Sequence, residues 1–284
     1  MAQKNSTNTS PYKTRLAARG ASTNPRTTLG RHEQPAAIYS IEEANDRLLD
    51  IFKNHNFDLV THQERRKLAH FYQILMTEQK KLNLTRLLKF HEIAIKHFID
   101  SLWILKFTGL KFPLLDLGTG PGFPGIPLKI KFPDEKIILA EGIQKRVEYL
   151  KIVREQLQLK NLDIIGRNIN PEFVYPIQGA ITRAVEDISN TLNNVSNCLQ
   201  VGGRVYFMKG PGVDPEIEAA KKIWSKYYKL IQNTIYQLPQ TSQDRRLVIY
   251  EKIANLPLTD TTDTAETETE EDKPDQESFG TPRK

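Results

Sequence analysis

The sequence predicts an α/β fold in which a mostly parallel sheet is covered by helices on both faces. From residue 112 onward, short apolar runs of strand length alternate with amphipathic stretches of helix length, a pattern typical of parallel sheets. The first of these runs leads directly into a glycine-rich turn and a helix. Before residue 110, apolar residues recur at helical spacing, so we expect a helical subdomain to precede the sheet.

The helical subdomain is expected to hold three helices between residues 40 and 107. Ser40 is suited to cap the first helix, and Glu43, three residues later, would complete a capping box. We interpret the apolar stripes of all three helices as core packing. These stripes consist of Ile41, Ala44, Leu48, Ile51 and Phe52; of Leu68, Phe71, Tyr72, Leu75 and Met76; and of Ile93, Ile95, Phe98, Ile99, Leu102, Ile104 and Leu105.

The second region is expected to form a sheet of seven strands. The expected strands cover residues 114–117, 136–140, 162–165, 180–183 and 204–208, followed by a terminal hairpin near 228–238 and 246–252. Helices are expected near 124–132, over 145–158, and over 189–199, where Gly202 and Gly203 would close the last of them.

The two ends of the chain differ in charge from the middle. Residues 1–35 hold six Lys/Arg and one acidic residue, whereas residues 255–284 hold nine acidic residues and three Lys/Arg. We expect a disordered basic arm and a disordered acidic tail, because neither has an apolar pattern to bury. The arm could be a functionless extension, a loose RNA contact or an organelle transit peptide. The helical subdomain would then be 36–110 and the main domain 111–254.

Composition narrows the class of protein further. Residues 36–254 carry a net charge of +7, which fits a polyanionic partner. The single cysteine, Cys198, cannot build a disulfide framework and indicates a reducing compartment. Neither a run of about 18 apolar residues nor a secretory h-region is present. We therefore expect a cytoplasmic protein that acts as a monomer and does not bind membranes.

A glycine-rich turn follows the first expected strand, and it is the strongest chemical signal in the sequence. It reads Asp-Leu-Gly-Thr-Gly-Pro-Gly-Phe-Pro-Gly over residues 116–125, with glycines at Gly118, Gly120, Gly122 and Gly125. Glycines let the backbone approach a ligand closely. Glu141 lies at the end of the next strand, about 20 residues downstream, where a carboxylate can accept both hydroxyls of a ribose.

Two cofactor classes use this arrangement. Counted from Gly118, the dinucleotide pattern fails at Phe123. Counted from Gly120 it fits, but prolines at 121 and 124 lack the N–H groups that a pyrophosphate would use. The spacing instead matches S-adenosylmethionine, with Asp116 facing the amino group of its methionine moiety. A dinucleotide site and a purely structural turn are the alternatives.

At this point the sequence resembles the RsmG (GidB) family, whose members are bacterial 16S rRNA guanine-N7 methyltransferases. The resemblance lies in Leu-Asp-Leu-Gly-Thr-Gly-Pro-Gly-Phe-Pro-Gly-Ile-Pro-Leu (115–128) and covers roughly residues 70–252. Further segments agree in the same order: 83–85, 96–102, 145–147 with 149–150, 182–184, 208–210 and 245–249. The resemblance implies a Rossmann-like S-adenosylmethionine-dependent methyltransferase fold, with 16S ribosomal RNA or the small ribosomal subunit as partner.

The resemblance also implies which residues act. Cofactor contacts would fall on Gly118, Phe123, the pair Asn168 and Ile169, and Arg183. The family's functional basic residues would be Lys145, Arg167, Arg183, Lys209 and Arg245. The sequence departs from the family at Glu78-Gln79, where Trp-Asn is usual, at Ile169, where Glu is usual, and at Gln144, where Gly is frequent.

Methyl transfer to guanine N7 needs no general base, because N7 carries a lone pair and no proton. We therefore predict no acid–base pair and no metal site. His97 is expected to pack or cap rather than to lie in the site, and His91 and His97 lack metal-ligand spacing.

Arg183 and Lys209 would end the fourth and fifth strands beside the ligand crevice, and we predict them as the catalytic residues. Lys145 and Arg146 open a helix, where cations oppose the helix dipole, so we expect them to bind RNA together with Arg167 and Arg245. Two other functions stay open at this point: methylation of another RNA or protein substrate, and an inactive fold retained as an RNA-binding module.

Overall fold

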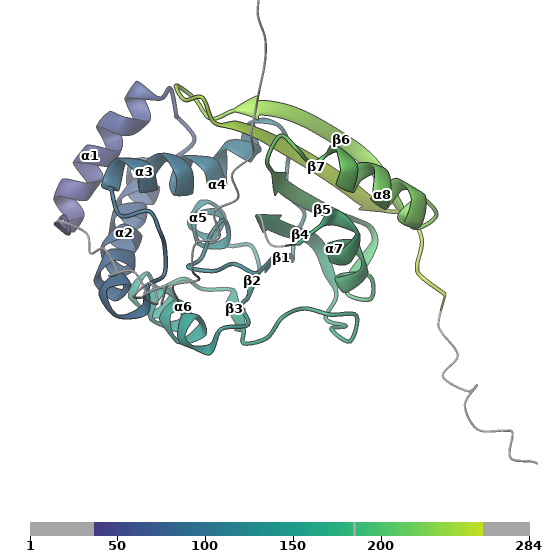
Figure 1. Cartoon of the computed structure of the whole chain (residues 1–284). Helices are drawn as coiled ribbons and strands as arrows, with labels where there is room; N and C mark the ends of the chain where they lie inside the picture. Colours follow the sequence, from purple (N-terminus) through teal and green to yellow (C-terminus); the bar gives the residue numbers. More distant parts are fainter. Residues whose placement is uncertain (1–36, 184–185, 258–284) are drawn as a thin grey trace, which may run out of the picture. The chain divides into compact units, whose positions relative to one another are not determined.

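The computed structural model describes residues 37–183 and 186–257 (Figure 1). The expected basic arm and most of the expected acidic tail lie outside these residues. Within the described part, a seven-stranded sheet has the strand order β3-β2-β1-β4-β5-β7-β6. Strands β3, β2, β1, β4 and β5 run parallel, and the last two pair antiparallel. The predicted mostly parallel sheet is confirmed.

The strand positions agree closely with the sequence periodicity. The strands are β1 (Leu114–Leu117), β2 (Ile137–Ala140), β3 (Leu162–Ile165), β4 (Ile177–Arg183), β5 (Leu199–Lys209), β6 (Tyr228–Gln237) and β7 (Asp244–Lys252). From β1 the chain proceeds outward through β2 to β3, and β4 then returns to the other side of β1. This reversal between β1 and β4 opens a crevice beyond the carboxyl ends of the two strands, which is where open α/β sheets bind ligands.

Alternate residues of each buried strand face two separate cores. On β1, for example, Leu114 belongs to the core shared with the N-terminal helices, and Leu115 to the core on the other face. Helices α5 (Gly125–Lys131) and α6 (Gln144–Gln156) cover the first face, and α7 (Ile188–Asn194) and α8 (Asp214–Trp224) cover the second. Asp116 points to the same side as Leu114 and is fully buried.

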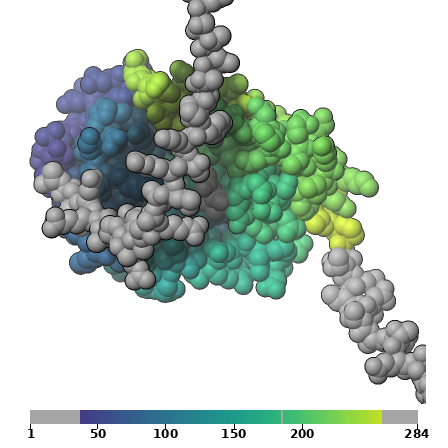
Figure 2. Space-filling model, viewed as in Figure 1, coloured from purple at the N-terminus to yellow at the C-terminus, as the bar shows by residue number. Residues whose placement is uncertain are grey.

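The N-terminal helices are α1 (Ile41–Asn54), α2 (His62–Leu82), α3 (Phe90–Ile93) and α4 (Asp100–Trp103). Their buried apolar residues join the first core, and α2 packs against both α5 and α6. On the face drawn in Figure 2, the surface of these helices, in purple and blue, lies opposite that of the green C-terminal elements. The subdomain boundary at 110 stays a prediction.

The third predicted helix is less regular than its apolar stripe suggested. Its middle, Ala94–Ile99, is π-helical, and Ile104–Lys106 is a 3₁₀ turn. π-helical turns occur mostly as single turns inside α-helices, often at functional sites. Residues 96–100 of this segment face the carboxyl end of β4, as described below.

Two local expectations were wrong, and one helix was missed. The helix expected over 189–199 ends at Asn194, and Leu199 already begins β5, so Gly202 and Gly203 lie inside a strand. The Asn and Ser residues at 193–197 compete for backbone hydrogen bonds, which explains the early end. Helix α8 was not predicted, although Pro215 stands in its first turn.

The capping box was predicted at the wrong helix. Ser40 does cap α1 by accepting from the Glu43 amide, but the Glu43 carboxylate binds Arg47 instead of returning to the cap. The complete box lies at α2, where Thr61 and Glu64 each accept from the other's amide N–H. No helix in the described part is both long and apolar enough to cross a membrane.

We expect Thr61→Ala to lower the free energy of unfolding by about 1 kcal/mol, because the amide of Glu64 loses its acceptor. Urea denaturation measures the change. Thr61→Ser keeps the hydroxyl and is the matched control, which should stay within a few tenths of a kcal/mol of the unsubstituted protein. Equal stability of both variants would show that this cap contributes nothing.

Candidate functional site

The glycine-rich turn between β1 and α5 places the backbone against the crevice at the carboxyl end of β1. Gly118, Gly120 and Gly122 have φ angles of 62°, 58° and 101°, a region that favours glycine. A Cβ added at Gly120 would meet no described atom within 4 Å, whereas one at Gly122 would lie 2.6 Å from Cγ1 of Ile126. The turn is therefore packed on one side and open beside Gly120.

Asp116 lies beneath this turn and is completely buried. Its Oδ2 accepts hydrogen bonds from the Thr119 hydroxyl at 2.6 Å and from the Gly125 amide at 2.8 Å. Its Oδ1 is buried and has no partner among the described residues. Burial raises the pKa of Asp116 to about 7. A buried carboxylate oxygen without a partner is costly unless a donor from a ligand reaches it.

Glu141 follows β2 and is also buried. Its Oε1 accepts from the Ile143 amide at 2.9 Å, and its Oε2 lies 3.6 Å from Nη1 of Arg146. The strand register aligns Leu117 with Ala140. Asp116 and Glu141 therefore stand at the same edge of the sheet, as the sequence predicted.

The segment after β3 completes this edge. Ala140 pairs with Ile165, so residues 166–169 lie next to Glu141. A Cβ added at Gly142 would lie 2.5 Å from Oδ1 of Asn168, which shows that the Asn168 amide fills the space beside that glycine. The Ile169 side chain is buried in the second core, so only its backbone is available to a ligand.

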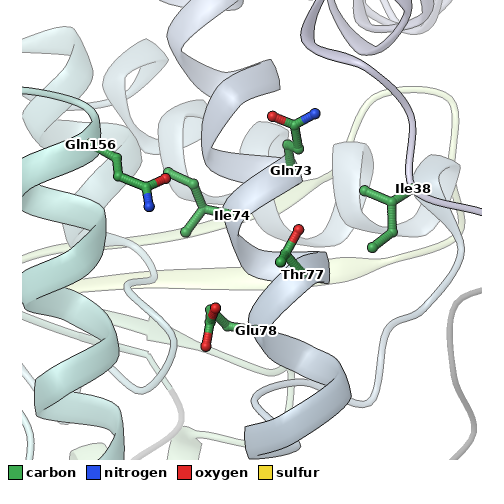
Figure 3. A pocket seen from close by; sticks show the side chains of 6 residues that line it. All are labelled: Ile38, Gln73, Ile74, Thr77, Glu78 and Gln156. Carbon is green, nitrogen blue, oxygen red and sulfur yellow. The ribbon is translucent and has the colours of Figure 1, made fainter.

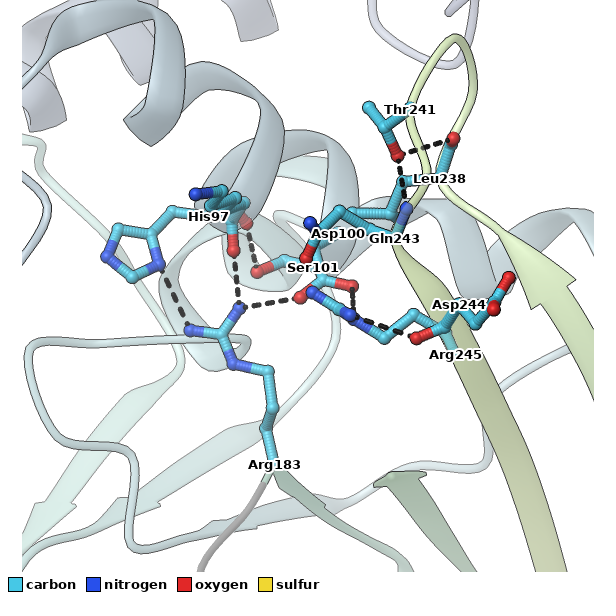
Figure 4. A network of polar contacts seen from close by, with 10 residues as sticks. His97, Asp100, Ser101, Arg183, Leu238, Thr241, Gln243, Asp244 and Arg245 are labelled. Atoms are coloured by element: carbon cyan, nitrogen blue, oxygen red, sulfur yellow. Dashed lines mark hydrogen bonds and ion pairs between the residues drawn. The ribbon is translucent and has the colours of Figure 1, made fainter. Parts of the chain in front are cut away.

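Arg183 ends β4 on the other side of β1, and its guanidinium is held by three acceptors (Figure 4). Nη1 donates to the Lys96 carbonyl at 3.1 Å and to Oδ2 of Asp100 at 3.3 Å, and Nη2 donates to the His97 ring at 3.2 Å. The guanidinium also lies 5.5 Å from the centre of the Phe123 ring. The π-helical segment and the glycine turn thus fix the position of this arginine together.

His97 joins the glycine turn to the helical subdomain. Its ring stacks on Phe123 with centroids 4.1 Å apart. Burial and the neighbouring charge of Arg183 lower the pKa of His97 to about 3. Because a guanidinium only donates, Nδ1 of His97 is the acceptor, and the proton lies on Nε2, which donates to the Thr85 hydroxyl at 3.0 Å. We expected His97 outside the site, but it lines the same pocket as Arg183.

Phe123 lies in the core rather than in the crevice. It is 3% exposed and packs against Phe71 and Phe98 as well as His97. A cofactor contact at this position would use its backbone, because the ring is surrounded by protein.

Asp100 is the site residue that the sequence analysis missed. Its side chain is 4% exposed, and it binds Arg183 through Oδ2 and Nε of Arg245 through Oδ1, the latter at 3.1 Å. One signal was available in the sequence: an acidic residue in the most apolar of the three helical stripes. A buried carboxylate in such a position requires cationic partners.

The other predicted basic residues fall in two groups. Lys209, at the end of β5, lines the pocket of Arg183, and its Nζ donates to the Glu186 carbonyl and to Oε2 of Glu216 at 2.9 Å. Arg245 lines the same pocket. It lies on β7, which is an inner strand of the sheet.

The second group lies beside Glu141 rather than in that pocket. Lys145 is exposed in the first turn of α6, and the next residue, Arg146, faces Glu141. Arg167 is exposed after β3, and its guanidinium lies 5.8 Å from the centre of the Phe173 ring. The structure therefore separates the predicted basic residues between the two sides of the crevice.

A second pocket lies between α2 and α6 and contains none of the predicted site residues (Figure 3). Glu78 is the one charged residue among those lining it, the others being Ile38, Gln73, Ile74, Thr77 and Gln156.

The neighbouring Gln79 turns inward instead, and its Oε1 accepts from the Thr85 amide at 2.8 Å. The pair Glu78-Gln79 departs from the family pattern. Within this pair, Gln79 supports Thr85 and, through Thr85, His97. Within the described residues, no cluster of three or more potential metal ligands occurs.

Comparison with known proteins gives one family. The family model of GidB, described as rRNA small subunit methyltransferase G, matches residues 64–248. The chain is 67% identical over 230 residues to Ribosomal RNA small subunit methyltransferase G 2 of Bdellovibrio bacteriovorus, with 81% of this chain and 90% of the relative covered. It is 34% identical over 209 residues to Ribosomal RNA small subunit methyltransferase G of Carboxydothermus hydrogenoformans, with 71% and 89% covered.

Among solved structures, TYW2 of M. jannaschii in complex with AdoMet matches 56% of this chain and 76% of its own, at 19% identity and a TM-score of 0.43. The family match is the more informative, because residues 64–248 include the glycine turn, Glu141, Arg183 and Arg245.

Proposed function

The chain belongs to the family of rRNA small subunit methyltransferase G, and we propose that it methylates N7 of a guanine in 16S ribosomal RNA, with S-adenosylmethionine as the methyl donor. The observation that carries the proposal is the family match across the whole crevice. The Oδ1 of Asp116 supports it independently, because this buried oxygen has no partner among the described residues and is free to accept from a bound ligand. The protein is proposed to act as a monomer in the cytoplasm.

S-adenosylmethionine would lie along the carboxyl ends of β1, β2 and β3. We assign Asp116 Oδ1 to its amino group and the Glu141 carboxylate to its ribose hydroxyls. The turn at Gly118, Gly120 and Gly122 would let the backbone approach, and Gly120 borders open space. The segment from 168 to 169 would contribute backbone or amide groups. Each of these groups lies at the edge of the sheet that borders the crevice, so the donor set fits this cofactor.

When bound, S-adenosylmethionine supplies the methyl group: the N7 lone pair forms the new carbon–nitrogen bond, and the electrons of the broken carbon–sulfur bond stay on sulfur. The task of the protein is to align the base with the methyl donor, and such positioning alone can contribute about 7–11 kcal/mol. His97 is unsuited as a base, because Nδ1 already accepts from Arg183 and Nε2 donates to Thr85.

Arg183 and Lys209 would act on the RNA side of the crevice. Of the five N–H groups of a guanidinium, Arg183 uses three for Lys96, Asp100 and His97. The remaining donors, which have no partner among the described residues, are proposed to bind the RNA backbone or guanine O6. Arg245 and Lys209 line the same pocket and would hold adjacent phosphates. Lys145 and Arg167 would contact RNA on the opposite side, beside Glu141, and Arg146 would serve there mainly as the partner of Glu141.

Two observations weigh against the alternatives. An inactive RNA-binding module would have no need for an unpaired buried oxygen at Asp116. A methyltransferase for another substrate is less well supported, because both relatives described above carry the small-subunit name.

The direct test is mass mapping of N7-methylguanosine in 16S rRNA from cells with and without this protein. We expect one guanine to lose its modification in the absence of the protein and to regain it when purified protein, S-adenosylmethionine and the RNA are combined. An unchanged modification map and no transfer in the reconstituted reaction would refute the proposal.

The raised pKa of Asp116 predicts pH-dependent cofactor affinity. Below its pKa of about 7, the ligand-free carboxyl is protonated, and binding of a cationic amino group must release that proton. The dissociation constant should therefore rise about tenfold for each pH unit below 7 and level off above it. Calorimetry at pH 5.5 to 8 measures this, with Asp116→Asn as control. The control should bind more weakly and lack the step near pH 7, so parallel profiles would contradict the assignment.

The raised pKa of Asp116 also affects the stability of the ligand-free protein. A carboxyl whose pKa is raised on folding stabilises the fold at acidic pH, and this contribution is lost as the pH rises through about 7.

For Arg183 we expect Arg183→Ala to reduce the single-turnover methylation rate by about tenfold or more, which corresponds to about 1.4 kcal/mol of transition-state stabilisation. Cofactor affinity, measured by calorimetry, should change less than the rate. Arg204→Ala is the control, because Arg204 lies in the middle of β5, away from Lys209, and pairs with Glu251. A normal rate for Arg183→Ala rules out the role, and equal losses of rate and affinity assign Arg183 to the cofactor alone.

A further inference from the structure

Asp100 joins three parts of the chain that are far apart in sequence. It follows the π-helical segment, whereas Arg183 ends β4 and Arg245 begins β7. Its two oxygens are divided between the two arginines, at 3.3 Å and 3.1 Å, and its side chain is 4% exposed (Figure 4). One buried carboxylate therefore neutralises one of two neighbouring guanidinium charges.

The surroundings leave the two arginines little freedom. Arg183 is also bound by the Lys96 carbonyl and by His97. Arg245 is placed by the turn between β6 and β7, where the Thr241 hydroxyl donates to the Leu238 carbonyl and accepts from the Gln243 amide. Nη1 of Arg245 donates in addition to the Asp244 carbonyl at 3.0 Å. Asp100 is the one acidic side chain among the residues that line this pocket.

The proposed reaction gives the carboxylate a specific task. Methylation converts a neutral guanine ring into a cation, because N7 contributes its lone pair to the new bond and has no proton to release. Unbalanced guanidinium groups next to that ring would oppose the change, since like charges repel strongly where water is excluded. A carboxylate shared by both arginines reduces this opposition and leaves their remaining donors in place.

We propose that Asp100 is a positioning residue for the methylation reaction: it orients Arg183 against the target guanine and offsets the positive charge of Arg183 and Arg245. The inference rests on the proposed function. Asp100 touches neither the base nor the methyl donor and acts through Arg183. The same carboxylate links the helical segment to both β4 and β7, so its effect on stability has to be separated from its effect on the reaction.

The first measurement is the single-turnover rate of Asp100→Asn with saturating S-adenosylmethionine and RNA. The rate should fall at least tenfold, while the dissociation constant for S-adenosylmethionine stays within about threefold. Asp100→Glu keeps the charge and should recover part of the rate. Glu251→Gln, which breaks the pair between Arg204 in the middle of β5 and Glu251 near the end of β7, is the matched control and should leave the rate unchanged.

A double-mutant cycle distinguishes positioning from plain structural support. If Asp100 acts through Arg183, Asp100→Asn should have little further effect on the rate once Arg183→Ala is present. Independent, multiplicative losses from the two substitutions would overturn the proposal, as would an unchanged rate in Asp100→Asn alone.

Asp100→Asn leaves two buried cations facing each other and could unfold the protein. A second pair of variants covers that case: Arg245→Gln, and Arg245→Gln combined with Asp100→Asn, which removes one cation together with the carboxylate. The double variant should unfold at a higher temperature than Asp100→Asn alone, because only one unpaired guanidinium remains, and it should still react at least tenfold more slowly than Arg245→Gln. Equal rates would overturn the proposal. Absence of any methylation by the unsubstituted protein would instead refute the proposed function, so the two failures are distinguishable.

Discussion

A carboxylate removed from water is stable only when cations or hydrogen-bond donors replace the lost hydration, and this requirement shapes the described part of the chain around Asp100. The two groups that satisfy it come from the end of β4 and the start of β7. Arg183 is also bound by the Lys96 carbonyl and by His97. Its guanidinium therefore fixes how the irregular helical segment, residues 94–106, lies against the sheet. These contacts fix the position of the glycine turn, on one side of the crevice, relative to the basic pocket on the other side.

A chain of hydrogen bonds extends this arrangement into the helical region. Gln79 holds the Thr85 amide, the Thr85 hydroxyl accepts from His97, and His97 accepts from Arg183. The ring of His97 rests on Phe123, so the glycine turn is packed against the same group. Position 79 departs from the usual family residue, and its side-chain amide supplies the acceptor that Thr85 needs. The orientation of His97 depends on this contact through Thr85.

The sequence was sufficient to predict features that depend on periodicity and local spacing. Strand positions, the order of most elements and the edge shared by Asp116 and Glu141 follow from short apolar runs that alternate with helix-length stretches, and from the glycine spacing. Features that depend on contacts between distant residues were missed. Asp100 could be recognised as unusual but not paired, because its partners lie 83 and 145 residues away. The capping box depended on which partner each glutamate reaches: Glu43 binds Arg47, whereas Glu64 returns to the Thr61 amide although Lys131 lies 3.3 Å from its carboxylate. The π-helical turn leaves no signature in the apolar stripe.

The separation of Asp100 from its two partners along the chain also constrains synthesis on the ribosome. The helical segment emerges first, at a stage when neither arginine has been made, and its carboxylate must remain hydrated until β4 arrives. Arg245 follows only with β7, the last strand of the sheet. Nascent chains that end before β7 therefore offer Asp100 at most one of its two cationic partners. The ability to transfer methyl groups would then appear late and abruptly during translation, when the β6–β7 hairpin pairs with β5.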